Sequence, residues 1–258
     1  MMSLSFEELR GFLNEKADFY NNPEFINDDP VQIPHRFSLQ QDVEIAGFLV
    51  ATISWGNRKA ILKSADKMLD FMGNSPFDFV MNFTEKDLSQ IENKAIHRTF
   101  SGEDFIYFIR RFRDVFEKYG SLEMLFKTEE NETDFYHAIE RFRIQFLLPE
   151  KHRSHKHISS PYKNSSSKRI MMFLRWMVRK DNRGVDLGIW KNTEAKFLSI
   201  PLDVHTGNIS RKLGLLTRSQ NDWKSVAELD LAIRKFDAQD PAKYDFALFG
   251  IGVTKDIL

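Results

Sequence analysis

The stretch that decides the fold begins Ser165-Ser-Ser-Lys168-Arg-Ile-Met-Met-Phe-Leu-Arg-Trp-Met-Val-Arg179 and continues, after a polar connection, with Ile200-Pro-Leu-Asp203-Val-His205. Apolar residues recur at helical spacing from Ile170 onward, and a serine run before them is typical of a helix N-cap. Asp203 stands between a proline and a second helix pattern over 206–213, so it is a natural N-cap as well. The sequence therefore predicts two consecutive helices, each preceded by short polar side chains.

Lys168 falls in the first turn of the earlier helix. It shares one helix face with Arg175 and Arg179, which follow it by seven and then four residues. The positive end of the helix dipole and the neighbouring Arg169 both disfavour a further cation there, and a neutral amine is a nucleophile. Lys168 is therefore a candidate nucleophile. The alternative is an ordinary solvated lysine at a helix start.

Charge is distributed unevenly along the 258 residues. The formal net charge is zero, yet residues 141–180 contain eleven Lys or Arg residues against the single acid Glu150. A local basic block indicates a polyanionic partner better than the overall charge does. At 30.3 kDa the chain forms one large domain or two closely packed ones.

Cysteine is absent, which excludes disulfides, thiolate metal sites and a cysteine-bound iron–sulfur cluster, so we expect no cofactor. The N-terminal residues lack the cationic and apolar segments of a signal peptide. The longest apolar run, residues 45–53, is too short to span a bilayer. We therefore expect a cytoplasmic protein without a membrane partner.

Helical periodicity dominates the rest of the chain. Residues 4–20 read as an amphipathic helix capped by Ser5, and residues 42–72 as two helices with a break at 54–57. Residues 75–148 carry helix after helix, and their phenylalanine stripes account for most of the 24 phenylalanines as core. Because no segment alternates in the manner of a strand, the predicted fold class is all-α.

The segment from Pro149 to Ser167 is the sharpest change in composition. It contains Lys151-His-Arg153-Ser-His-Lys156-His157. Three histidines so close together suggest a metal site, but the surrounding bases and the lack of a carboxylate would repel a cation. We expect no metal here and favour a basic loop that contacts phosphate, with Lys163 as a further contact.

The segment Pro201-Leu-Asp203-Val-His205, followed by Ile209, Arg211 and Leu213-Gly-Leu215, resembles the V-D-x-H-x-x-R…R-L-G segment of helix-hairpin-helix DNA glycosylases, the endonuclease III superfamily. The separation of Lys168 from Asp203 is similar to that in the archaeal 8-oxoguanine glycosylases. As a whole, the chain resembles the bacterial group called domain of unknown function 2400, whose typical K-R-x-x-M-F-L-R-W-M-V-R segment stands at 168–179.

The glycosylase resemblance implies a fold and a site. Two helical subdomains, 38–180 and 1–37 with 181–258, would flank a cleft and act as a single functional unit over 1–258. Lys168 would be the catalytic lysine and Asp203 the catalytic aspartate. The Leu-Pro-Gly-x-Gly hairpin of the family is absent, and the basic loop would occupy its place.

The segment Phe48-Leu-Val-Ala-Thr-Ile-Ser54 resembles the glycosylase segment L-x-x-x-x-L-S-x-Q-x-T, whose polar residues meet DNA beside the extruded nucleotide. Here Trp55-Gly-Asn57-Arg58 replaces the usual Gln and Thr. Asn57 could supply the missing hydrogen bonds and Trp55 could stack on a base. Equally, Trp55 could be a buried residue at the end of a core helix.

The implied activity is excision of an oxidised or otherwise damaged base from DNA, with Lys168 as nucleophile, strand nicking by a lyase step, and Asp203 stabilising positive charge on the sugar. The alternatives are a non-catalytic nucleic-acid-binding protein of the same fold and a hydrolase that uses Asp203 and His205 on a non-DNA substrate. We expect a monomer that binds DNA, with RNA as the alternative polymer. The residues expected to contact nucleic acid are Trp55, Asn57, Arg58, Lys151, Arg153, Lys156, Lys163, Arg169, Arg175, Arg179 and His205.

Overall fold

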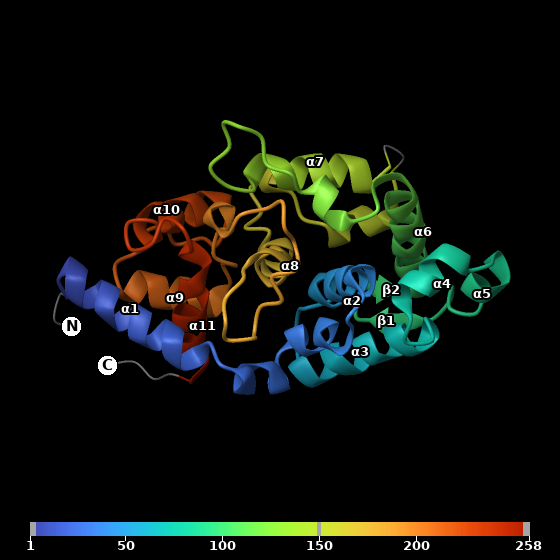
Figure 1. Cartoon of the computed structure of the whole chain (residues 1–258), viewed down its shortest axis with the longest axis horizontal. Helices are drawn as coiled ribbons and strands as arrows, with labels where there is room; N and C mark the ends of the chain where they lie inside the picture. The colour runs from blue at the N-terminus through green and yellow to red at the C-terminus, as the bar shows by residue number, and fades with distance from the viewer. Residues whose placement is uncertain (1–3, 149–150, 255–258) are drawn as a thin grey trace.

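A computed structural model describes residues 4–148 and 151–254 of the chain (Figure 1). These residues are mostly helical, with one small antiparallel sheet of β1 (Ala95–His97) and β2 (Phe100–Ser101). The all-α fold class is thereby confirmed. The α-helices are α1 (Phe6–Tyr20), α2 (Gln40–Thr52), α3 (Arg58–Phe71), α4 (Pro76–Asn82), α5 (Glu85–Ser89), α6 (Gly102–Tyr119), α7 (Tyr136–Phe146), α8 (Lys168–Val178), α9 (Val204–Lys212), α10 (Trp223–Ile233) and α11 (Tyr244–Thr254).

The helices form two groups with α8 between them (Figure 1). Helices α1, α9, α10 and α11 lie at one end, where α11 packs against both α1 and α9. Helices α2 to α7 lie at the other end. Short 3-10 turns between residues 23 and 36 connect the first helix to the second group. The subdomain boundaries at 37/38 and 180/181 stay a prediction.

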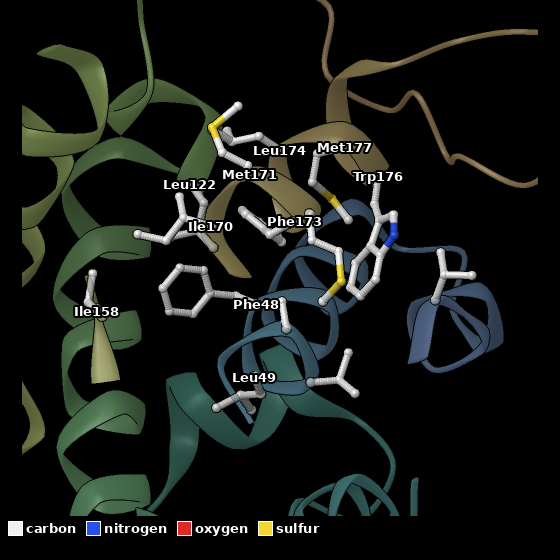
Figure 2. Packing of buried hydrophobic residues seen from close by; sticks show 14 of the residues in the cluster. Phe48, Leu49, Leu122, Ile158, Ile170, Met171, Phe173, Leu174, Trp176 and Met177 are labelled. Carbon is white, nitrogen blue, oxygen red and sulfur yellow. The ribbon is translucent and has the colours of Figure 1, made fainter. Parts of the chain in front are cut away.

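Phe48 of α2 is the centre of the larger group's core. Its ring lies 5.3 Å from that of Phe173 in α8, edge to face at 89°. Aromatic pairs in this geometry contribute more stability than the burial of their apolar area alone provides. Figure 2 shows the two side chains near each other in the buried cluster. The other rings within 6.0 Å of Phe48 are those of Phe108, Phe112, Phe142 and Phe146, so the phenylalanine stripes are core, as predicted.

Helices α2 and α8 approach closely because Gly47 faces α8. A Cβ built on Gly47 would lie 3.0 Å from Cε of Met177, tighter than ordinary van der Waals contact. Ten consecutive residues of α2, from Val43 to Thr52, are buried. A helix apolar on nearly all sides is buried in the core, and this fixes α8 against the centre of the molecule.

The start of α8 differs from the prediction of a serine cap. Ser167 adopts a left-handed backbone (φ 49°, ψ 32°), and its side chain makes no capping hydrogen bond. The serines instead stabilise the chain before the helix. Oγ of Ser165 accepts from the amide of Ser167 at 3.2 Å, and Oγ of Ser166 donates to the carbonyl of Leu202 at 3.3 Å. The serine run therefore ties the start of α8 to the segment that precedes α9.

Asp203 is the N-cap of α9, as predicted. Its Oδ1 accepts from the amide of Thr206 at 2.9 Å, and its backbone is extended. The side chain of Asn221 donates to the carbonyl of Asp203 at 2.8 Å. A Cβ on Gly207 would lie 2.6 Å from Oδ1 of Asn221, so this contact requires glycine. Asp203 is thus fixed by both its own helix and the loop before α10.

Ser5 caps α1 as predicted, with Glu8 completing a capping box. No helix within 4–148 or 151–254 has the length and apolarity that a membrane span requires.

Candidate functional site

A pocket of about 810 Å³ lies where five separate segments meet. It is lined by the 25–30 turns, the 54–61 turn and helix start, the first turns of α8, the 201–205 segment and one face of α11. A concave site assembled from distant segments and lined by both apolar and charged groups is the usual form of a ligand site. The lining residues are Phe25, Asp29, Pro30, Ser54, Trp55, Gly56, Arg58, Ile61, Lys168, Arg169, Met172, Arg175, Pro201, Asp203, Val204, His205, Asp245, Phe249 and Val253.

Lys168 and Asp203 both line this pocket. Lys168 is the first residue of α8 and is half-buried, and its amine has no hydrogen bond or ion pair with the described part of the chain. Asp203 is half-buried too, and Thr206 bonds only its Oδ1. Opposite charges thus lie in one pocket without pairing.

Asp245 is a functional candidate that the sequence analysis missed. It is the second residue of α11, is 5% exposed, and pairs through Oδ2 with Nη1 of Arg175. Burial raises the pKa of Asp245 to about 6. The positive charges of Arg175 and Lys168 oppose the rise, and the negative charge of Asp203 adds to it. A carboxyl with a perturbed pKa in a cleft is a mark of a functional site.

Asp29 is a second carboxylate that the sequence analysis missed. Its Oδ1 accepts from the amide of Val31 at 3.0 Å, and the side chain is buried at the pocket wall. Burial raises the pKa of Asp29, while the bond from Val31 and the nearby Arg175 oppose the rise. The sequence around each acid could have identified it: Asp245 is the lone acid of an apolar helix, and Asp29 precedes a proline.

Arg169 contributes a cation to the pocket without a carboxylate partner among the described residues. Its guanidinium donates to the carbonyl of Thr52 and lies 4.8 Å from the centre of the Trp55 ring. Burial lowers the pKa of Arg169 to about 10, far above neutral pH, so the side chain stays charged. A guanidinium stacked on indole is a favourable cation–π arrangement.

Trp55 lies at the boundary between the pocket and the core. The ring lines the pocket and is half-buried, and it also packs against the buried His157 ring at 6.1 Å. The carbonyl of Trp55 lies 3.1 Å from Nε2 of His97. Arg58, three residues after Trp55, also lines the pocket, and its guanidinium lies 5.4 Å from the centre of the Phe249 ring.

His205 lines the pocket from the first turn of α9. Nδ1 of His205 is hydrogen-bonded to the carbonyl of Gly252 at 3.2 Å, which links α9 to α11. A Cβ on Gly252 would lie 2.9 Å from Cβ of His205, so the glycine allows this approach.

Two of the expected nucleic-acid contacts have structural tasks outside the pocket. Asn57 caps α3 by accepting from the amide of Ala60 at 3.2 Å, so its carbonyl oxygen is committed. Arg179 is 4% exposed, and its guanidinium is held by Asp240 at 2.9 Å and Asp181 at 2.6 Å. A buried guanidinium with carboxylate partners is unavailable to phosphate, so the expectation that Arg179 contacts nucleic acid is corrected.

Arg175 lines the pocket but is also committed to carboxylates. Nε donates to Oδ1 of Asp186 at 3.1 Å, and Nη1 pairs with Asp245. With 4% of its surface exposed, Arg175 holds the pocket wall together rather than reaching out to a phosphate. This too departs from the nucleic-acid contact that was expected of Arg175.

The basic loop packs against α6 and does not line the pocket. Arg153 pairs with Glu103 at 2.8 Å, while Lys151, Lys156 and Lys163 are exposed. Within the stretch 151–157, the His157 ring packs against Trp55 at the pocket wall. The start of the predicted loop, residues 149 and 150, lies outside the described residues.

The three loop histidines are held by protein partners. His152 stacks on the Tyr107 ring at 4.2 Å, and Nε2 of His155 lies 3.2 Å from the Tyr107 hydroxyl. Nε2 of His157 lies 3.3 Å from Asp104. Across residues 4–148 and 151–254, no group of three metal-ligating side chains is close enough to hold an ion.

Comparison with known proteins identifies a family. The model of the family described as "Protein of unknown function (DUF2400)" matches residues 29–254, which include every residue of the pocket except Phe25. No curated protein matches the chain, and no solved structure does.

Proposed function

Because the chain belongs to the DUF2400 family, whose description specifies no reaction, we propose its function from the pocket: a DNA glycosylase with lyase activity that removes a damaged base. The proposal includes the helix-hairpin-helix glycosylase-like architecture that the 201–215 segment resembles. The observation that carries it is the presence of Lys168 and Asp203 in one pocket, both without an ion-pair partner within the described residues.

The chemistry needs one nucleophile and one negative charge. A neutral Lys168 amine attacks the anomeric carbon of the deoxyribose, the bond to the base breaks, and opening of the sugar leaves a Schiff base on Nζ. Positive charge develops on the sugar as the base departs, and the carboxylate of Asp203 stabilises it. β-Elimination from the Schiff base then nicks the strand. These steps use the chain's own side chains and require no cofactor.

The size and lining of the pocket are compatible with an extruded nucleotide. Its volume of about 810 Å³ falls within the range of small-molecule sites. Phe25, Trp55 and Phe249 supply aromatic surface at its walls. Enzymes that act on a base in a duplex extrude it into such a pocket, where aromatic side chains replace its stacking partners.

Cations around the pocket support a polyanionic partner. Arg58 and Arg169 line it without carboxylate partners in the described chain. The basic loop exposes Lys151, Lys156 and Lys163, which would contact backbone phosphates farther along the DNA from the extruded nucleotide. Phosphate contacts position a duplex without reading its sequence, and they make the affinity depend steeply on salt.

The test is excision from duplexes that each carry one defined lesion, with 8-oxoguanine first because the Lys–Asp spacing resembles the archaeal enzymes. We expect release of a base and nicking at the same position. Salt-sensitive binding without release from any lesion would instead support a non-catalytic nucleic-acid-binding protein. Tighter binding to RNA than to DNA would change the polymer that we propose.

A further inference from the structure

Asp245 has one oxygen that the fold does not use. Oδ2 pairs with Arg175, while Oδ1 has no hydrogen-bond partner in the described residues. The side chain lines the same pocket as Lys168 and Asp203. It extends from α11, a helix whose other residues are almost all apolar. A carboxyl in a cleft whose pKa is perturbed by burial and by a charged partner is a candidate functional group.

The proposed reaction leaves one proton unassigned. An ammonium group has no lone pair, so Lys168 must lose a proton before it attacks the sugar. Three carboxylates line the pocket and could receive it, namely those of Asp29, Asp203 and Asp245. In each of the three, the fold uses one oxygen: Oδ1 of Asp203 accepts from the amide of Thr206, Oδ1 of Asp29 from the amide of Val31, and Oδ2 of Asp245 pairs with Arg175.

Electrostatics favours Asp245 among the three. The negative charge of Asp203 acts on Asp245, and Lys168 acts on it as well, so all three groups lie within interaction range. Two carboxylates that share a site resist being ionised together, and the proton goes to the one with the less favourable surroundings for charge. Asp245 is buried, whereas Asp203 is only half-buried.

We propose that Oδ1 of Asp245 accepts the proton that Lys168 loses, directly or through one water molecule. This inference rests on the proposed glycosylase function. The N–H bond of the ammonium breaks as the O–H bond of Asp245 forms, and the freed lone pair of Nζ bonds to the anomeric carbon. The bond to the base breaks with its electron pair on the base, which takes the proton from Asp245 and leaves the carboxylate as it began.

The groups that face Asp245 come from four segments. Lys168 and Arg175 act on it from α8, Asp186 from the loop after α8 and Asp203 from the segment entering α9, while His205 and Asp29 line the same pocket. Burial raises the pKa of Asp245 to about 6. The carboxyl is therefore already protonated below about pH 6 and able to accept a proton above it, so the rate should rise with pH through that value.

The experiment measures the single-turnover rate at which the full-length protein forms a borohydride-trapped adduct with duplex DNA containing one abasic site, from pH 4.5 to 8.5. Wild type should show a rise centred near pH 6. Asp245→Asn should lose that rise and react on the order of 10²-fold more slowly at pH 7.5, the lower end of the usual contribution from proton transfer.

Asp186→Asn is the matched control, because Asp186 is the other buried carboxylate on Arg175 and does not line the pocket. This variant should keep the rise near pH 6, whereas a purely structural role of Asp245 predicts the same defect in both variants. His205→Gln and Asp29→Asn test the other groups at the wall. Each should keep the rise, and loss of it in either would assign the titration to that side chain and overturn the proposal.

The outcomes separate this inference from the function on which it rests. A trapped adduct in wild type, with the rise near pH 6 intact in Asp245→Asn, overturns the role of Asp245 and leaves the glycosylase proposal standing. No adduct with wild type overturns both. Should melting show that Asp245→Asn does not fold, the wild-type, His205→Gln and Asp29→Asn profiles still decide, because a flat wild-type profile contradicts the proposal.

Discussion

Lys168 and Asp203 stand at the starts of two successive helices, α8 and α9, and line the same pocket although 34 residues lie between them. The two segments are joined just outside the pocket, where Oγ of Ser166 donates to the carbonyl of Leu202 at 3.3 Å. Each residue is therefore positioned by a helix terminus rather than by a flexible loop. A site built on regular elements holds its geometry better than one built on loops.

Asp203→Asn should slow base release by roughly 10²- to 10³-fold, since one preorganised charge contact contributes on that order. The amide can still cap α9, so we expect a stability loss of at most about 1 kcal/mol. The measurement is single-turnover base release, with thermal melting to verify folding.

Asp222→Asn is the control for that variant. Asp222 also caps a helix, accepting from the amide of Ser225 at 3.1 Å, but it does not line the pocket. Base release should remain near wild type in this variant. Equal slowing in both would mean that Asp203 acts only as a cap.

Reversing two exposed lysines of the basic loop, with Lys151→Glu and Lys156→Glu together, should weaken DNA binding by a similar factor for every sequence. The slope of log affinity against log salt should decrease by about 0.9 for each phosphate that the variant no longer neutralises. Arg153 is left in place because its ion pair with Glu103 holds the loop on α6. Fluorescence anisotropy at several salt concentrations measures both quantities.

The matched control reverses Lys86 and Lys118, which are exposed on α5 and α6 outside the 141–180 block. Binding should change less in this variant than in the loop variant. If the two double variants bind alike, the loop makes no specific phosphate contact and its charge acts only through the overall field.

Asp230 should make stability depend on pH. It is buried in α10, Oγ of Ser199 donates to it, and burial raises its pKa to about 7 from an ordinary 3.8. Between those values the native state holds a proton that the unfolded chain releases, so the unfolding free energy falls as pH rises, by at most about 4 kcal/mol from this group.

Urea denaturation of Asp230→Asn at pH 5 and pH 8 checks this, with the exposed Asp70→Asn as the reference variant. The fall in unfolding free energy should be smaller in Asp230→Asn than in wild type and unchanged in Asp70→Asn. An identical fall in all three proteins would contradict the assignment to Asp230.

Local patterns predicted the helices and the cap at Asp203, because an aspartate after a proline and before an amphipathic segment has few other uses. They failed at Ser167, since serines favour capping in general but here they bond to other loop groups. The partners of the charged side chains were harder to predict from the sequence. Arg179 pairs with Asp240 from a distant segment, and Asp245 reaches the pocket from the last helix. Only the tertiary arrangement brings such pairs together.

The most direct test of the account is trapping of the Schiff base. Wild-type protein incubated with an abasic-site duplex and borohydride should give one covalent adduct that contains one protein molecule and one DNA duplex. Lys168→Gln should give none, while Lys86→Gln, which removes an exposed lysine of α5 outside the pocket and outside the 141–180 block, should give as much as wild type. An adduct that persists in the folded Lys168→Gln protein, or its absence from wild type, would contradict Lys168 as the nucleophile.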